Sequence, residues 1–353
     1  MTRRSFLLAV LLLAGLAGCR SQARTPVKVL FAGSLIIPFH ALEEAYEAAH
    51  PEIDLQLEGH GSIQVIRHVT EIHDLVDVVA TADSALIPAL MYQSSVPETG
   101  EPYADWRIEF ATNRLSLAFT PQSLYADTIS VENWYQVIAR SDVKVGLSDP
   151  RFDPSGYRAL MVLQMAEDYY GQPTIFEDIT LAQFVGPLSV DESEELTTIR
   201  VPRIVDTRDG AHLVVRGSSI ALIALLESGD LDYAFEYESV IRQHGFEMIA
   251  LPAALNLGDE AFADDYARVQ VAMDFQRFAS VTPVFRGEVI RYAVTIPTDA
   301  PHPQEAAEFL AFLLGPEGQA VMAANDHPIF TPALTDQFER LPAVLQPLCV
   351  AQP

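Results

Sequence analysis

Short apolar stretches alternate with amphipathic segments from residue 27 to about residue 325, and this alternation limits the folds open to the chain. Residues 27–31 predict a buried strand, and Pro38 begins a helix in which Phe39, Leu42 and Tyr46 recur at helical spacing. Strands and helices in turn predict an α/β protein with a largely parallel sheet. We expect further strands near residues 53–57, 77–80, 114–119, 143–147, 213–216, 231–237 and 289–296, and further helices from residue 62 and near residues 157–169, 218–228 and 303–325.

Three segments break this alternation. Residues 93–102 and 189–195 are polar or acidic and predict surface loops. The chain from about Thr331 onward is rich in proline, and we expect it to be only partly ordered.

Glycine and serine recur at the points where a predicted strand passes into a helix. A glycine lets the backbone approach a ligand closely, and a serine places a hydroxyl beside helix N–H groups that favour negative charge. Each serine could instead simply cap its helix. Because ligands of open α/β sheets bind at these strand ends, the recurrence favours an oxyanion-binding cleft. The clusters lie at residues 32–34, 61–62, 153–157 and 217–219.

The N-terminus carries the pattern of an export signal. Arg3 and Arg4 precede an apolar run over residues 6–17, which at 12 residues is shorter than the roughly 20 that a membrane-spanning helix needs. The run ends in Leu-Ala-Gly before Cys19, which looks like a bacterial lipobox. We therefore expect residues 1–18 to be a lipoprotein signal peptide and Cys19 to be lipidated. Residues 2–7 also resemble a twin-arginine motif, so either export route stays open.

The cysteine content and the net charge further limit the kinds of protein and ligand to consider. Cys349 is the only other cysteine, so a lipidated Cys19 leaves no disulfide within the chain. The formal net charge of −26 argues against nucleic acid, because phosphate backbones demand clustered lysine and arginine. An anionic ligand remains possible, since backbone N–H groups and hydroxyls can build an anion site without basic side chains.

Catalytic signatures are missing from the sequence, which contains no nucleophile elbow, phosphate-binding loop or dinucleotide fingerprint. His60, His68 and His73, with Asp77 nearby, are a conceivable cation site. His68 and His73 are five residues apart, which predicts different faces of a helix. We therefore interpret the histidines as surface or capping residues, with a zinc receptor as the alternative.

Several segments together resemble the periplasmic tungstate/molybdate-binding proteins of ABC importers, in particular their tungstate-type branch. The resemblance runs in order from about residue 26 to about residue 332. It rests on residues 31–35, 82–88, 103–106, 110–114, 153–158, 222–229, 235–237, 292–297 and 312–318.

The resemblance implies a type II periplasmic-binding-protein fold with two α/β lobes joined by crossing hinge strands and the ligand in the cleft. One lobe would comprise residues 26–112 and 288–335, and the other residues 113–287. Residues 19–25 would form a lipidated linker, and residues 336–353 a C-terminal tail without a counterpart.

The resemblance also implies site residues. The carboxylates that bond to the tungsten or molybdenum fall on Asp153 and Glu236, and the oxyanion-binding serines fall on Ser34 and Ser62. Glu238 stands where a basic residue is more usual, which adds negative charge beside Glu236. Further possible contacts are Gly33, Ser155, Gly156 and Tyr237.

Two carboxylates make physical sense only against a particular kind of anion. A carboxylate repels a dianion unless its oxygen bonds to the central atom. Mo(VI) and W(VI) are hard centres that can expand from four oxygens to six, whereas sulfur in sulfate cannot. Asp153 and Glu236 would therefore reject sulfate and hold tungstate or molybdate.

These features predict a monomeric, lipid-anchored receptor outside the cytoplasmic membrane, with no enzyme activity and no cofactor. Its ligand would be tungstate or molybdate, and its partners the permease and ATPase of an ABC importer. A receptor for another oxyanion such as phosphate, whose protonated form could donate to Asp153, is the alternative. An extracellular α/β hydrolase and a sensory or adhesive lipoprotein are less favoured.

Overall fold

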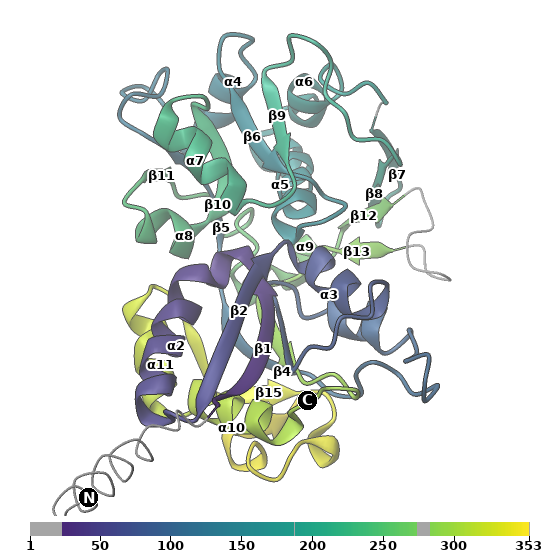
Figure 1. Ribbon diagram of the computed structural model, residues 1–353. Helices are drawn as coiled ribbons and strands as arrows, with labels where there is room; N and C mark the ends of the chain where they lie inside the picture. Colours follow the sequence, from purple (N-terminus) through teal and green to yellow (C-terminus); the bar gives the residue numbers. More distant parts are fainter. Residues whose placement is uncertain (1–22, 187, 274–282, 353) are drawn as a thin grey trace, which may run out of the picture.

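The computed structural model describes residues 23–186, 188–273 and 283–352, so the segment expected to be a signal peptide and Cys19 lie outside the described residues. The strands form three sheets, and the ribbon divides into a lower half and an upper half (Figure 1). Within the described ranges, no helix has the length and apolar character needed to cross a membrane.

The lower half is built on a seven-stranded sheet in the order β16-β15-β4-β14-β3-β1-β2. Helices α2, α10 and α11 pack together, while α3 contacts β1 and β3. The strands are β1 (Thr25–Ala32), β2 (Ile53–His60), β3 (Val78–Thr81), β4 (Ile108–Thr112), β14 (Arg291–Thr295), β15 (Ile329–Thr335) and β16 (Cys349–Ala351). The helices are α2 (Ile36–Ala49), α3 (Ser62–Thr70), α10 (Pro303–Leu314) and α11 (Pro316–Ala324).

The upper half contains a five-stranded sheet, β11-β5-β10-β6-β9, and a four-stranded sheet, β13-β12-β8-β7 (Figure 1). The first consists of β5 (Leu115–Phe119), β6 (Val145–Ser148), β9 (Leu213–Arg216), β10 (Tyr233–Tyr237) and β11 (Glu247–Ile249), and the second of β7 (Ser189–Glu192), β8 (Thr197–Val201), β12 (Val269–Met273) and β13 (Val284–Arg286). Its helices are α4 (Trp134–Ile138), α5 (Pro154–Tyr170), α6 (Ile175–Thr180), α7 (Ile220–Ser228), α8 (Glu238–Gln243) and α9 (Ala263–Tyr266).

Helix α5 lies at the centre of the upper half, where it contacts β5, β6, β10 and β12. Every residue from Pro154 to Glu167 is buried, which explains why the helix is apolar on nearly all sides over residues 159–163. Its N-terminus therefore has a fixed position, and the residues just before it are held rigidly beside the ends of β6 and β10.

The chain passes between the halves next to residues 113–114 and again near residues 287–290, and the two crossings touch. The Thr112 hydroxyl donates to the Ile290 carbonyl oxygen at 2.7 Å, and the Ile290 N–H donates to Leu257 O at 2.7 Å. The crossing strands thus form one hydrogen-bonded connection between the halves.

The α/β fold predicted from the sequence is confirmed, but the expectation of a largely parallel sheet is wrong. β1 pairs in parallel with β2 and β3, whereas β14 runs antiparallel to both β3 and β4. β5 is likewise antiparallel to β10. The strands next to the crossings run in the opposite direction to their neighbours. The sheets therefore contain both parallel and antiparallel strand pairs.

Two other expectations differ from the structure. The single helix expected over residues 303–325 is two helices, because Pro316 lacks an N–H and begins α11 after Gly315. The chain after Thr331, expected to be partly ordered, contributes β15 and β16 to the seven-stranded sheet. Cys349 on β16 is buried, because this end of the chain packs onto the sheet.

Candidate functional site

Asp153 occupies the N-cap of α5 and connects two helix N-termini. Its Oδ1 accepts a hydrogen bond from the Ser155 N–H at 2.9 Å, and its Oδ2 accepts one from the Ser219 N–H at 2.9 Å, just before α7. Burial raises the pKa of the Asp153 carboxyl, while these two N–H groups and the charge of Arg158 act in the opposite direction.

Glu236 lies near the end of β10 and is fully buried. Its Oε1 accepts a hydrogen bond from the Tyr237 N–H at 2.7 Å, whereas Oε2 has no hydrogen-bond partner in the described part of the chain. Burial raises the pKa of Glu236 to about 8, and the negative charge of Asp153 also raises it. The structure therefore brings these two carboxyl groups close enough to influence each other.

Like Glu236 Oε2, two serine hydroxyl oxygens are buried and lack hydrogen-bond partners in the described part of the chain. Neither Ser148 Oγ nor Ser155 Oγ has a partner among the residues that the structure describes, and both side chains are buried. Ser148 ends β6, and continuing the register that pairs Ala234 with Gly146 places it level with Glu236. Buried polar atoms without partners are uncommon in proteins, so their concentration here fits a polar ligand.

The two serines predicted in the lower half are buried but already have partners. The Ser34 hydroxyl lies 2.8 Å from the Tyr292 hydroxyl, which also accepts a hydrogen bond from Asn113 Nδ2 at 3.2 Å. Ser62 Oγ accepts a hydrogen bond from the Ala82 N–H at 2.9 Å, which leaves its own proton free to be donated.

The remaining predicted contacts serve packing and closure in this structure. A Cβ on Gly156 would lie 2.2 Å from the Ser148 carbonyl oxygen, so only glycine allows α5 to approach β6 this closely. A Cβ on Gly33 would meet Ile220 Cγ2 of the upper half at 3.1 Å. The Tyr237 hydroxyl accepts a hydrogen bond from Arg158 Nη1 at 2.8 Å.

Direct bonds join the two halves beside these residues. Arg158 Nη1 donates to the Ala82 carbonyl oxygen at 2.7 Å, and its Nη2 lies 3.2 Å from Asp83 Oδ2 in an ion pair. The Tyr157 hydroxyl donates to the same Asp83 oxygen. The structure is therefore a closed arrangement in which the lower-half residues 82–83 contact the start of α5.

Electrostatics at this junction are dominated by acids. Arg158 is a buried cation that forms an ion pair with Asp83 and acts to lower the pKa of Asp153, and Glu236 is a further buried acid beside Asp153. Sequence reasoning did not select Arg158 or Ser148 as site residues. Arg158 was visible only as a charged residue within an otherwise apolar helix, and Ser148 only as a serine directly after a predicted strand.

A family model described as "Bacterial extracellular solute-binding protein" matches residues 27–325, which is most of the chain. The chain belongs to this family. It is 39% identical over 323 residues to an uncharacterized solute-binding protein of Methanoculleus marisnigri, covering 91% of this chain and 86% of the relative. It is 38% identical over 347 residues to the molybdate/tungstate-binding protein WtpA of Thermococcus kodakarensis, covering 92% and 91% of the two chains.

The fold agrees with this assignment to the solute-binding family. The periplasmic molybdate-binding protein of Azotobacter vinelandii superposes with a TM-score of 0.53 at 15% identity, covering 85% of this chain and 98% of that structure. The type II periplasmic-binding-protein fold expected from the sequence is confirmed.

Glu238 of this solute-binding protein does not add an unbalanced charge to the site. Its Oε2 lies 3.4 Å from Arg242 Nη2 and 3.9 Å from Arg114 Nη1, and its Oε1 accepts a hydrogen bond from Ser116 at 3.2 Å. Two arginines on the hinge side therefore balance the carboxylate that the sequence placed next to Glu236.

The structure gives partners to the histidines that the sequence predicts to be surface or capping residues. His73 contacts the Tyr103 hydroxyl, and Asp77 accepts hydrogen bonds from the N–H groups of Lys28 and His302, so both have structural partners elsewhere. The His60 and His68 rings are partly exposed and stack with their centroids 4.9 Å apart. Sequence spacing alone could not show this contact, because β2 and α3 turn back on each other at Gly61.

Proposed function

We propose that this solute-binding protein captures tungstate or molybdate between its two halves and delivers the anion to an ABC importer. The observation that carries the proposal is the fully buried Glu236 carboxyl, whose Oε2 has no hydrogen-bond partner among the described residues and whose pKa responds to the neighbouring Asp153. A buried carboxyl oxygen without a hydrogen-bond partner is costly in a folded protein unless it serves a ligand.

The acidic surroundings select the kind of ligand. An ordinary oxyanion brought beside Asp153 and Glu236 would meet repulsion, with one buried cation, Arg158, to offset it. Tungsten and molybdenum can accept both carboxylates as additional oxygen ligands, which converts the repulsion into bonds. The same pair of acids excludes sulfate, because its sulfur accepts no further oxygen ligands.

In this proposal the ligand also contacts neutral groups. Ser34 and Ser62 approach from the lower half, with backbone N–H groups nearby, and Ser148 and Ser155 contribute hydroxyls from the upper half. Gly33, Gly156 and Tyr237 shape the surrounding wall and hold the halves together. The 38% identity over nearly the whole chain to a protein named as molybdate/tungstate-binding supports this choice of ligand.

The two halves would act as lobes, with residues 26–112 and 288–335 in one and residues 113–287 in the other. Residues 336–353 would complete the first lobe, since β16 pairs with β15. Export and lipid attachment at Cys19 rest on residues 1–19, and would place a monomeric receptor at the membrane surface beside its permease. The anion is cargo, and no catalysis is required of the protein.

A calorimetric titration tests the proposal. Tungstate, molybdate, sulfate and phosphate are titrated separately into the purified ligand-free protein. We expect tight binding of tungstate and molybdate alone. Preferential binding of phosphate would replace the proposed ligand with another oxyanion, and no binding of any of the four would refute an oxyanion receptor.

A further inference from the structure

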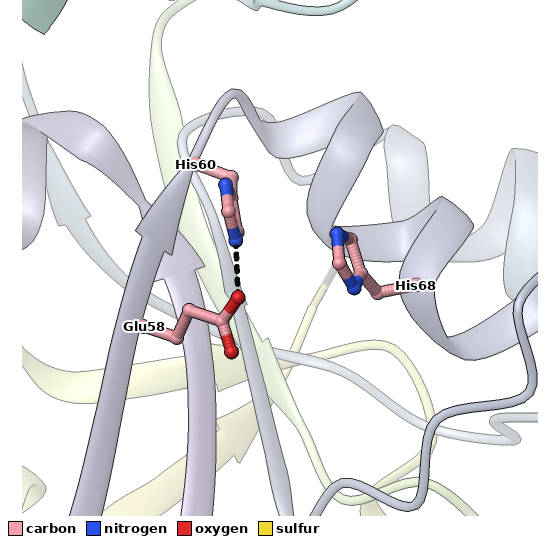
Figure 2. A group of neighbouring side chains, drawn as sticks. All are labelled: Glu58, His60 and His68. Atoms are coloured by element: carbon pink, nitrogen blue, oxygen red, sulfur yellow. Dashed lines mark hydrogen bonds and ion pairs between the residues drawn. The ribbon is translucent and has the colours of Figure 1, made fainter.

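A second cluster of side chains that could bind a metal lies in the lower half, on the strand and helix joined by Gly61. Glu58 and His60 belong to β2, and His68 belongs to α3. Figure 2 shows the three side chains pointing toward one another from these two elements. One potential ligand atom from each residue lies within 4.8 Å of those of the others.

The elements that carry the cluster are rigid. Glu58 and His60 are two residues apart on a strand, so they share one face of it, and β2 pairs with β1 along its whole length. His68 is fixed because Ile66 and Val69 beside it are fully buried. The single residue Gly61 separates β2 from α3, so a very short connection holds the two elements together.

A fourth residue orients one of the histidines. His68 Nδ1 lies 2.8 Å from Asp74 Oδ2, and an ionised carboxylate can only accept, so Nδ1 donates its proton there. The Nε2 atom of neutral His68 is then left with a lone pair. A carboxylate behind the remote nitrogen of a histidine is the usual support of a metal-bound imidazole.

The charges at the cluster favour a cation. Lys28 Nζ lies 3.7 Å from Glu58 Oε2 and 3.7 Å from Asp74 Oδ2, which leaves Glu58 Oε1 to face His60 Nε2 at 2.7 Å. With neutral histidines, two carboxylates and one ammonium give a net charge of −1. Simple ion pairing does not explain the stacked rings, because two protonated imidazoles whose centroids are 4.9 Å apart would repel each other.

The donor set specifies the class of metal. Two imidazole nitrogens and one carboxylate oxygen suit zinc and other late divalent metals, with a position left for water. Calcium and magnesium prefer sets of oxygen ligands and are poorly served by this cluster. The side chains of Glu58, His60 and His68 are 43%, 30% and 26% exposed, so an ion can reach them from solvent.

We propose that Glu58, His60 and His68 form a binding site for a divalent transition metal such as Zn²⁺, separate from the oxyanion site. The metal takes the place of the proton between His60 Nε2 and Glu58 Oε1, and that histidine then carries its proton on Nδ1. By joining β2 to α3, the ion also secures the Gly61 turn that positions Ser62.

The test is a titration of the purified, anion-free protein with Co²⁺, followed by visible absorption, and then competition by Zn²⁺. We expect saturable binding of one Co²⁺ per chain that Zn²⁺ displaces, and an increased melting temperature with Zn²⁺. Glu58→Gln, His60→Gln and His68→Gln should each weaken binding at least about tenfold, and Asp74→Asn by roughly 10–100-fold.

His40→Gln is the matched control, because His40 also contacts a glutamate, Glu43, at 2.9 Å but belongs to no metal-ligand cluster among the residues that the structure describes. It should bind the metal like the unaltered protein. Asp153→Ala should also retain metal binding, which separates this site from the oxyanion site. The proposal is overturned if no saturable binding occurs, or if the cluster variants bind as well as the His40 control.

Discussion

The Ile63 N–H donates a hydrogen bond to the Phe152 carbonyl oxygen at 3.0 Å, joining the start of α3 in the lower half to the residue before Asp153 in the upper half. Gly61 lies under this contact, since a Cβ built there would be 2.5 Å from the same Phe152 oxygen. This approach of the two halves therefore depends on the absence of a side chain at residue 61.

Gly61→Ala should weaken tungstate binding at least about tenfold, because the added methyl group prevents full closure. The midpoint of thermal unfolding without ligand should change little, since the clash exists only between closed halves. Calorimetry and thermal melts measure both effects. Gly217→Ala is the control, because a Cβ there has only Gln64 Nε2 near it, at 4.0 Å. A Gly61→Ala protein with unchanged tungstate affinity would contradict this account of closure.

Glu236→Gln should abolish tight tungstate binding and stabilise the ligand-free protein at high pH. The Glu236 pKa is raised to about 8, so its contribution to stability is fully present below the unfolded-state pKa and is lost as the pH rises through 8. A glutamine at residue 236 does not ionise, so the variant does not lose this contribution to stability as the pH rises. Above pH 8 we expect a gain of at least about 1 kcal/mol, seen as a higher melting temperature.

The pH dependence provides an internal control for the Glu236→Gln experiment. The stability difference between this variant and the unaltered protein should shrink as the pH is lowered. Thermal melts over a pH series measure it. A difference that does not depend on pH would show that Glu236 does not titrate in this range.

Tungstate binding should release a proton. A carboxylate must be deprotonated to ligate a metal, and Glu236 with a pKa of about 8 is largely protonated at neutral pH. The affinity should therefore rise with pH up to about 8, by at most about tenfold per unit. Calorimetry in buffers of different ionisation enthalpy counts the protons released. Affinity that falls as the pH rises through 8 would instead show a protonated Glu236 donating a hydrogen bond to the anion.

Asp153→Ala and Glu236→Ala should each weaken tungstate binding far more than Ser155→Ala. The two acids would supply bonds to the metal, whereas Ser155 can supply at most one hydrogen bond, worth about 1 kcal/mol or a factor of five to ten. Because Ser155 Oγ is buried and has no hydrogen-bond partner in the described ranges, its removal should leave the ligand-free protein equally or more stable. Equal losses of affinity in all three variants would exclude coordination by the carboxylates.

The strands and helices that were predicted from sequence, such as β1 and α5, show clear periodicity, which is a local property. Asp153 shows how far such reasoning reaches. Its place before Pro154 is typical of a helix N-cap, and its Oδ1 accepts a hydrogen bond from the Ser155 N–H. Its second bond, to the Ser219 N–H, joins residues 66 positions apart, and no local pattern could reveal it.

Non-local pairing also explains the strands that were missed. Residues 189–195 are acidic and were expected to be a loop, yet 189–192 form β7 at the edge of the four-stranded sheet. Exposed charges are common on edge strands, so composition alone does not separate such a strand from a loop. The sequence suggested His60 and His68 as a conceivable cation site but could not establish their contact, because it depends on the angle at which α3 leaves β2.

Both described ends of the chain lie in the lower half, which carries β1 and β16, while the upper half is attached through two neighbouring crossings (Figure 1). A tether at the N-terminal end would therefore hold the seven-stranded sheet and leave the upper half as the part that swings. A fluorophore on each half would then report unequal rotational freedom in a tethered protein, and the difference would diminish when the halves close.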